Sequence, residues 1–296
     1  MSQLAEAALA GWRFSWWTTI FLLVAVALYL RGFIRVHRQM PLRFPLRRLA
    51  FYLAGNAALA IALVSPLEAL DDCLLITHML QHLLLLLIAP PLILLGAPQI
   101  PLVRAIPPAL AKPTIGVIAK SRTCRILLDS LTHPVGGLTL FTFMMLGWHL
   151  PGPFQLALRS NGWHIAEHGC FIIAGTFFWY PIVQPWPAAE RCSRWALVPY
   201  LLIADAENSV LGAFMIFSGQ LLYPFYAEVP RLAGISPLTD QIVAGAIMWV
   251  PMSILFLVPA VTIVVRALQP TTLAPTRANG FANDANLSAV IKRRAV

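Results

Sequence analysis

The sequence predicts an all-α integral membrane protein with seven transmembrane helices. Hydrophobic residues make up 59% of the 296 residues and charged residues only 11%, and the mean hydropathy is +0.75. Soluble domains carry about 25% charged residues. Seven apolar runs approach the roughly 20 residues that a helix needs to cross a bilayer. The basic residues between these runs alternate in a way that predicts an N-terminus outside and a C-terminus in the cytoplasm.

The seven runs lie within residues 1–270, which we expect to form one transmembrane domain. Their approximate ranges are 14–31, 49–66, 74–96, 135–150, 163–183, 196–218 and 241–266. Trp16 and Trp17 fall near the outer end of the first run, as expected of tryptophans at a membrane–water interface. Residues 271–296 are polar and weakly patterned, so we expect them to form a flexible cytoplasmic tail.

Proline marks two positions in this plan. Pro90 and Pro91 fall inside the third run, where their missing amide hydrogens are expected to kink or end the helix near its cytoplasmic side. Between the third and fourth runs, residues 97–120 are rich in proline and only half apolar. We expect this stretch to form an interfacial loop or a short amphipathic helix.

Lysine and arginine predict the orientation, because cytoplasmic loops of membrane proteins are enriched in them. Of the 21 Lys and Arg residues, 18 fall in the first, third and fifth loops and in the C-terminal segment. Only Arg13, Arg159 and Arg231 fall on the other side. The short second loop, which would then lie outside, is acidic and contains Glu68, Asp71 and Asp72.

The net charge of +9 does not indicate nucleic-acid binding. The basic residues flank membrane spans, and no basic patch is interleaved with aromatic side chains as in nucleic-acid-binding motifs. The four cysteines, Cys73, Cys124, Cys170 and Cys192, form no CxxC or CxxxC pair. This argues against a thiol redox enzyme and against a copper carrier built on a cysteine pair.

Five of the seven histidines fall at a similar depth near the outer ends of three consecutive runs. The third run enters from outside, the fourth leaves toward the outside and the fifth enters again, so their outer ends share one membrane face. The five residues are His78, His82, His149, His164 and His168. His37 and His133 fall on the cytoplasmic side, where histidine is an ordinary interfacial residue. Ionisable residues inside membrane spans usually indicate function.

The spacing of these histidines predicts a metal site. His78 and His82, like His164 and His168, are four residues apart, which places each pair on one helix face about 5–6 Å apart. With His149, the two faces offer three or four nitrogen ligands, which suit copper, zinc, iron or nickel. The alternatives are hydrogen bonding or proton relay between helices, and bis-histidine ligation of a haem.

Glu167 and Met79 are accessory candidates for this site. Glu167 belongs to an H-x-x-E-H pattern that occurs in some zinc peptidases, where the glutamate is the general base. It is also three residues from His164 and could orient that imidazole instead. Met79 follows His78 and offers the soft thioether that Cu(I) prefers. An intramembrane zinc hydrolase is therefore a competing function.

The sixth run carries Asp205, Glu207 and Asn208 near its middle. Charge at that depth is expensive and is usually paired or functional. These residues either form a proton or cation path below the histidines or hydrogen-bond to a neighbouring helix.

Several motifs occur together and in a fixed order. They are H-M-x-x-H with a leucine run in 77–98, W-H-x-P in 148–151, H-x-x-E-H in 164–168, F-W-x-P in 178–181, and a final block in 245–251. In combination they resemble the multi-spanning CtaG family of cytochrome c oxidase assembly factors. The resemblance covers roughly residues 15–266, nearly the whole apolar part of the chain.

The resemblance implies a role in the maturation of haem–copper oxidases, at the cytoplasmic (inner) membrane of a bacterium. It implies a non-enzymatic metallochaperone that delivers copper to the catalytic subunit of the oxidase. Carried over residue by residue, the implied metal positions are His78, His82, His149, His164 and His168, the same five that the topology selects.

Overall fold

The computed structural model describes residues 14–107, 121–188, 190–230 and 234–269, together with Glu6, Leu9 and Trp12. The expected tail, residues 271–296, and much of the proline-rich stretch 97–120 lie outside the described residues. The described part of the chain is helical and contains no β-strand. Its long helices are α2 (Trp16–Gln39), α3 (Leu46–Val64), α10 (Pro134–His149), α12 (Asn161–Val183), α13 (Leu197–Phe217) and α15 (Pro237–Leu268).

A further rod is continuous but changes geometry along its length. It consists of α5 (Leu75–Leu83), a π-helical turn η1 (Leu84–Ile88) and α6 (Ala89–Leu95). The short elements are α4 (Leu67–Asp71), α7 (Gln99–Ala105), α9 (Arg122–Leu131), α11 (Pro151–Arg159), the 3₁₀ turn η2 (Arg194–Ala196) and α14 (Phe225–Glu228).

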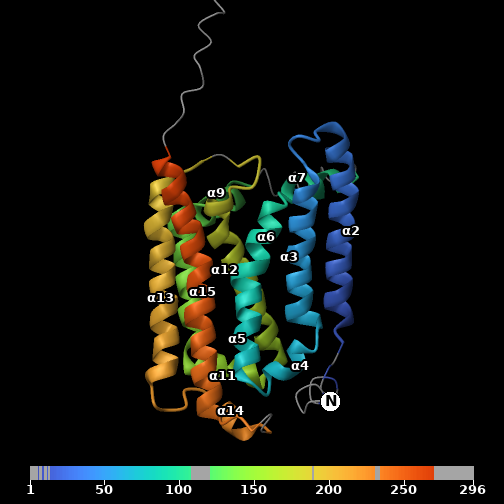
Figure 1. Cartoon of the computed structure of the whole chain (residues 1–296). Coiled ribbons are helices and arrows are strands. Elements are labelled where there is room, and N and C mark those ends of the chain that lie inside the picture. The colour runs from blue at the N-terminus through green and yellow to red at the C-terminus, as the bar shows by residue number, and fades with distance from the viewer. Residues whose placement is uncertain are drawn as a thin grey trace, which may run out of the picture.

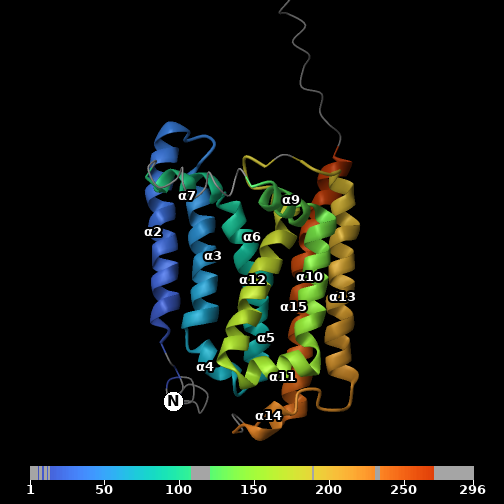
Figure 2. The same cartoon turned by 180° about the vertical axis from the view of Figure 1, so that it is seen from behind.

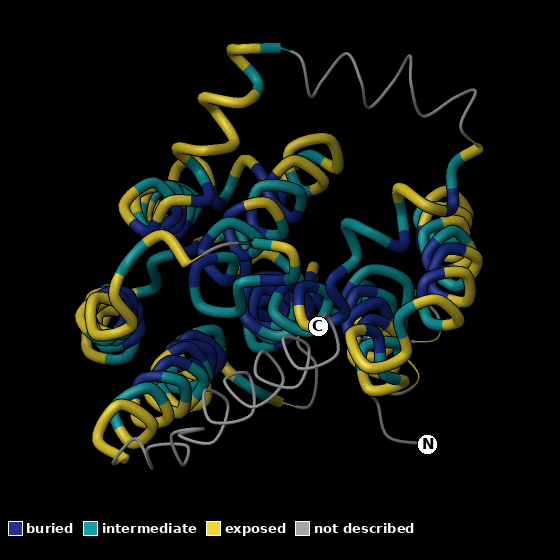
Figure 3. The backbone as a smooth tube through the Cα atoms, turned by 90° about the horizontal axis from the view of Figure 1, so that it is seen from above, coloured by how far each residue is buried: buried dark blue, intermediate teal, exposed yellow. Residues whose placement is uncertain are grey.

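The long helices run side by side as a bundle, and the short helices gather at its two ends (Figures 1 and 2). Helices α4, α11 and α14 lie at one end, which we call the α4 end. Helices α7 and α9 lie at the opposite α9 end. Viewed along the bundle, many buried residues face the interior and many exposed residues face outward (Figure 3).

Five helical segments of the described residues are long and apolar enough to cross a membrane: Trp16–Gln39, Leu46–Val64, Leu75–Leu95, Arg194–Phe217 and Pro237–Leu268. The other two predicted spans are also helices. Helix α10 has 16 residues, which gives about 24 Å, less than the roughly 30 Å of a bilayer core. Helix α12 is long enough but carries Glu167 among its histidines. Seven spans and their orientation therefore stay predictions.

The break expected at Pro90 and Pro91 takes the form of the π-helical turn. Pro90 stands in the first turn of α6, where a missing amide hydrogen is tolerated, and η1 immediately precedes it. Helix α12 packs closely against this turn, because a Cβ on Gly175 would collide with the carbonyl oxygen of Leu86. Helix α12 therefore approaches the rod formed by α5, η1 and α6 at a point just beyond their histidine pairs.

Two apolar clusters hold the bundle together. The larger one involves most of the long helices and includes Phe141, Phe171, Phe178 and Phe256. The smaller one lies between α2, α3 and α7, where the rings of Tyr29 and Tyr52 stack with their centroids 3.7 Å apart. Polar side chains that lie inside the larger cluster are consequently removed from solvent.

Candidate metal centre

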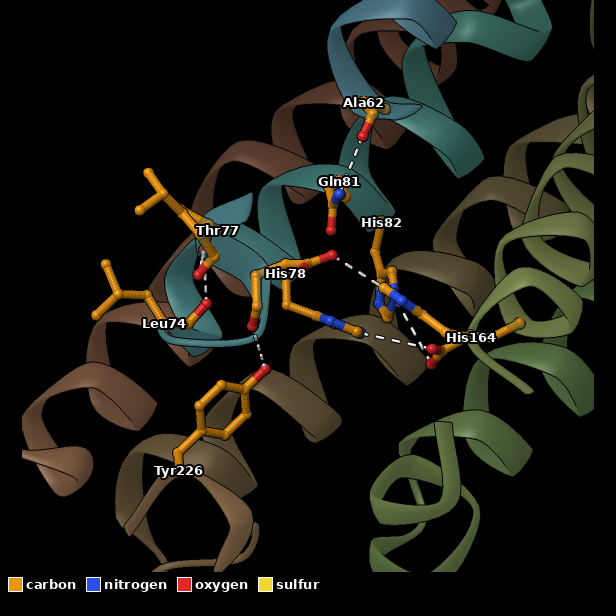
Figure 4. A network of polar contacts seen from close by, with 11 residues as sticks. Ala62, Leu74, Thr77, His78, Gln81, His82, His164 and Tyr226 are labelled. Carbon is orange, nitrogen blue, oxygen red and sulfur yellow. Dashed lines mark hydrogen bonds and ion pairs between the residues drawn. The ribbon is translucent and has the colours of Figure 1, made fainter. Parts of the chain in front are cut away.

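The structure brings the five predicted histidines together near the α4 end of the bundle. On α5, the ring centroids of His78 and His82 lie 4.3 Å apart. On α12, the ring centroids of His164 and His168 lie 4.2 Å apart. The two pairs meet where His78 and His164 lie 5.3 Å apart. His149, the last residue of α10, lies 5.5 Å from His82. Figure 4 shows His78, His82 and His164 side by side.

Burial makes this cluster chemically unusual. The exposed fractions of His78 and His82 are 0% and 1%. Each of the five imidazoles has a buried Nε2 atom with no hydrogen-bond partner among the described residues. Buried polar atoms in proteins are nearly always paired, and an unpaired one costs about 1–3 kcal/mol. Nitrogen atoms gathered in this way fit a metal ion, which would be bound by several of them at once.

Glu167 supplies a carboxylate between the two histidines of α5. Its Oε2 atom lies 3.6 Å from Nε2 of His78, and its Oε1 atom lies 3.6 Å from Nε2 of His82. Ligand atoms that bind one ion at about 2 Å lie roughly 3–4 Å apart. Glu167 therefore contacts the imidazoles of another helix, whereas the sequence suggested that it orients His164 or acts as a general base.

Asp71 is a functional candidate that the sequence did not single out. Its Oδ2 atom lies 3.4 Å from Nε2 of His164, and its side chain is 1% exposed. Asp71, His78 and His164 each offer a ligand atom within 4.8 Å of the others, as do His78, His82 and Glu167. The available signal was the position of Asp71 in an acidic loop directly before the helix that carries His78.

His149 and His168 flank these two groups of three. The ring of His168 lies 6.1 Å from that of His82 and 6.3 Å from that of His78. Nδ1 of His149 lies 2.7 Å from the carbonyl oxygen of Met145, which fixes Nδ1 as the donor and leaves Nε2 without its proton. Met79 is completely buried in the larger apolar cluster, and its role as an accessory ligand stays a prediction.

Contacts from distant parts of the chain position these ligands. The carboxylate of Asp240 on α15 accepts hydrogen bonds from the backbone amides of Leu75 (2.7 Å) and Ile76 (3.0 Å), and so caps the start of α5. The hydroxyl of Tyr226 donates to the carbonyl oxygen of Asp71 (2.9 Å), and Gln81 donates to Ala62 (2.9 Å; Figure 4). None of these partners is close in sequence, so sequence reasoning missed them.

Acidic side chains surround the approach to the cluster. Burial, reinforced by the neighbouring Asp72, raises the pKa of Glu68 to about 7. The same two causes raise the pKa of Asp71 well above its ordinary value. Both carboxyl groups therefore hold protons at pH values where an exposed carboxyl would be ionised, and a bound cation would compete with those protons.

The mid-bundle residues of α13 contact neighbouring helices. The carboxylate of Glu207 accepts a hydrogen bond from Thr142 of α10 at 2.8 Å, and Asn208 donates to the carbonyl oxygen of Met248 on α15 at 2.7 Å. These bonds favour helix pairing over a proton or cation path for both residues. One oxygen of Asp205 is buried without a hydrogen-bond partner among the described residues.

The fold and the site define a class: in its described part, an all-α protein with helices long and apolar enough to cross a membrane, and with a buried cluster of histidines and carboxylates near one end. Residues 27–269 match the family of cytochrome c oxidase caa3 assembly factors. The chain belongs to this family.

The chain is also similar to uncharacterised proteins of mycobacteria. It is 27% identical over 230 residues to one from Mycobacterium leprae, and 26% identical over 232 residues to one each from Mycobacterium bovis and Mycobacterium tuberculosis. Each match covers 75% of this chain and 34% of the relative, so the chain spans about a third of the length of these relatives. No solved structure gives a significant match.

Proposed function

We propose that this chain binds copper through its histidine cluster at the outer face of a bacterial cytoplasmic membrane and delivers it to the catalytic subunit of cytochrome c oxidase. The observation that carries the proposal is the set of buried, unpaired imidazole nitrogens around the carboxylate of Glu167. Imidazole suits copper, and haem–copper oxidases need copper for their maturation. Membership in a family of oxidase assembly factors supports the proposal that cytochrome c oxidase is the partner.

Delivery requires a site from which the metal can leave. The side chain of His164 is 15% exposed, whereas His78 and Glu167 are completely buried. The cluster therefore has one partly accessible edge and a buried interior. An ion held by ligands at such an edge can be exchanged.

The position of Glu167 favours a carrier over a zinc hydrolase. In a hydrolase of the H-x-x-E-H type, the glutamate acts on a water bound to the metal held by its own helix. Here the Glu167 carboxylate contacts His78 and His82 of α5 instead. The dense packing of the imidazoles against Phe154 and Phe171 favours a small ion over a haem.

Complementation of a deletion strain tests the function. The gene for this chain is removed from its host, and the copper-to-haem ratio of the purified oxidase is measured after re-expression of wild type, H78N/H82N or H37N/H133N. The last variant removes the same number of histidines away from the cluster, and Asn at position 133 keeps a side-chain cap for α10. We expect H37N/H133N to restore the copper content and H78N/H82N to fail.

Three results would contradict the proposal. The first is full copper loading of the oxidase with H78N/H82N. The second is zinc-dependent hydrolytic turnover by the purified chain that Glu167→Gln abolishes. The third is a haem absorption band in the purified chain.

A further inference from the structure

We propose that the metal centre has two adjacent positions that share His78, and that a cation reaches the inner position by way of the other. The inner position consists of His78, His82 and Glu167. The entry position consists of Asp71, His78 and His164. This proposal rests on the proposed function, because it describes how the same cluster takes up a first-row transition-metal ion.

Geometry supports an ion at either position. Within each group of three, one ligand atom per residue lies within 4.8 Å of the other two. The shortest separations are 3.4 Å in the entry position, between Asp71 and His164, and 3.6 Å in the inner position, between Glu167 and either histidine of α5. These separations suit atoms that bind one ion.

His78 can belong to both positions. Both of its ring nitrogens are buried and have no hydrogen-bond partner among the described residues. Its imidazole lies 4.3 Å from that of His82 and 5.3 Å from that of His164, measured between centroids. An ion could therefore exchange Asp71 and His164 for His82 and Glu167 while His78 stays bound, with no change in oxidation state.

A pocket of about 870 Å³ determines which position is reached first. Asp71 and His164 line this pocket. The inner ligands His82 and Glu167 do not line it and are 1% and 0% exposed. A cation that enters from the pocket consequently meets the entry position before the inner one.

The pocket also has the oxygen ligands that a cation path needs. Its lining includes the carboxyl groups of Glu68, Asp71 and Asp72, and no lysine or arginine lines it among the described residues. Carboxyl oxygens are ligands for a metal cation, and a cation that binds them takes the place of the protons that these groups hold. Asp71 differs from the other two because it is almost completely buried, with an unpaired oxygen directed at His164.

The backbone of Asp71 is fixed, as a ligand requires. Tyr226 of α14 donates its hydroxyl to the Asp71 carbonyl oxygen at 2.9 Å. The start of α5, which carries His78, is held separately by Asp240. The backbone at Asp71 and the start of the helix that carries His78 are thus held by two independent contacts.

Uptake of copper(I) by the purified chain in detergent tests the proposal. Copper(I) is presented anaerobically from a chromophoric chelator, and both the rate of transfer and the equilibrium occupancy are measured. The variants are Asp71→Asn and His164→Asn for the entry position and His82→Asn for the inner position. Glu68→Gln is the control, because it removes a carboxylate from the pocket without removing a proposed ligand.

We expect Asp71→Asn and His164→Asn to slow uptake by about tenfold or more while copper still occupies the inner position at equilibrium. His82→Asn should bind copper quickly but lose it readily to the chelator. Glu68→Gln should slow uptake less than Asp71→Asn does. Because Asp71 and His164 lie on different helices, agreement between their variants excludes a local folding defect as the cause.

Two results would overturn the two-position centre and leave the proposed function standing. One is uptake by Asp71→Asn and His164→Asn at the wild-type rate. The other is loss of all equilibrium copper from folded Asp71→Asn, which would indicate a single site. Failure of the wild-type chain to bind any copper(I) would instead overturn the proposed function itself.

Discussion

Glu167 brings one carboxylate to two imidazoles of another helix, and this contact distinguishes the cluster from a set of packed histidines. A carboxyl group that is completely buried and has no hydrogen-bond partner destabilises a fold. Its placement 3.6 Å from His78 and from His82 becomes favourable when a cation joins the three residues. The residue is thus expected to serve binding at the expense of stability.

Replacement of Glu167 by glutamine tests whether this carboxylate favours metal binding and destabilises the metal-free fold. Glu167→Gln removes the charged ligand but keeps the size of the side chain. We expect copper affinity to fall by about 10- to 100-fold and the melting temperature of the metal-free protein to rise. Glu207→Gln is the matched control, because that carboxylate lies on α13 and bonds to Thr142. An unchanged affinity in Glu167→Gln, measured by chelator competition, would remove Glu167 from the ligands.

The sequence predicted the histidines of the site but not the residues that contact or position them. The i, i+4 spacing and the depth of each residue predicted that His78, His82, His149, His164 and His168 share one site. Asp71 was missed because its role depends on the tertiary packing that brings its side chain to His164 of α12, and a linear pattern does not predict such a contact. Asp240 was missed for the same reason, since it caps α5 by accepting from Leu75, which is 165 positions away in the chain.

At the scale of elements, α5 has its N-terminus capped by another helix. The residue before it, Leu74, provides no side-chain cap, and the carboxylate of Asp240 takes over by accepting from the first two amides. A negative group at this position also interacts favourably with the helix dipole. The cap lies one turn before His78, so it sets the height at which the first imidazole enters the cluster.

Asp240→Asn is expected to weaken both the cap and the site. Asn has one acceptor oxygen where the carboxylate accepts from both Leu75 and Ile76, so one backbone amide loses its partner. This lowers the free energy of unfolding by about 1–3 kcal/mol, and displacement of His78 lowers copper affinity. Ser236→Ala is the control, because Ser236 caps α15 itself by accepting from Thr239. Thermal unfolding should report a loss in both variants, whereas copper affinity should fall only in Asp240→Asn. Equal copper affinity in the two variants would contradict the positioning role.

Gly175 allows α12 to pack closely against the rod formed by α5, η1 and α6. A Cβ at Gly175 would collide with the carbonyl oxygen of Leu86, whereas a Cβ at Gly169 on the same helix would meet nothing within 4 Å. We expect Gly175→Ala to lower the free energy of unfolding by about 1–3 kcal/mol and to weaken copper binding by moving the two histidine pairs apart. Gly169→Ala should preserve both properties. Wild-type copper affinity in a folded Gly175→Ala variant would contradict this account.

Hydropathy predicted that the seven runs form helices, but it did not predict where their geometry changes or where they end. All seven predicted runs are helical, because an apolar run of this length can satisfy its backbone only as a helix in lipid. The π-helical turn before Pro90 depends on how the chain accommodates a missing amide and a close neighbour. The 16 residues of α10 end at His149, where Pro151 begins α11 instead of extending the span.

The described residues distribute their basic side chains unequally between the two ends of the bundle. Arg43 in the loop between α2 and α3, together with Arg104, Arg122 and Arg191, lies at the α9 end. The acidic loop lies at the α4 end with the histidine cluster. The charge rule predicts that the α9 end faces the cytoplasm and the histidine cluster faces outside. This orientation would place the cluster where copper is exchanged outside the cytoplasm.

Labelling of single cysteines tests the orientation. Cys73 lies in the loop after α4, and Cys192 lies just before η2 at the opposite end. In variants that keep only one of them, we expect a membrane-impermeant maleimide to label Cys73 in intact spheroplasts and Cys192 only after the membrane is permeabilised. The reverse pattern would place the histidine cluster on the cytoplasmic side and contradict the proposed route of delivery.

The copper content of the purified chain shows whether the histidine cluster binds copper. Wild type, H78N/H82N and H37N/H133N are purified from the same copper-supplemented cells, and copper, zinc and iron are measured per chain. The account predicts copper in the wild type and in H37N/H133N, and its loss from H78N/H82N without loss of helical content. Equal copper in H78N/H82N and wild type, or no copper in any of the three, would contradict it.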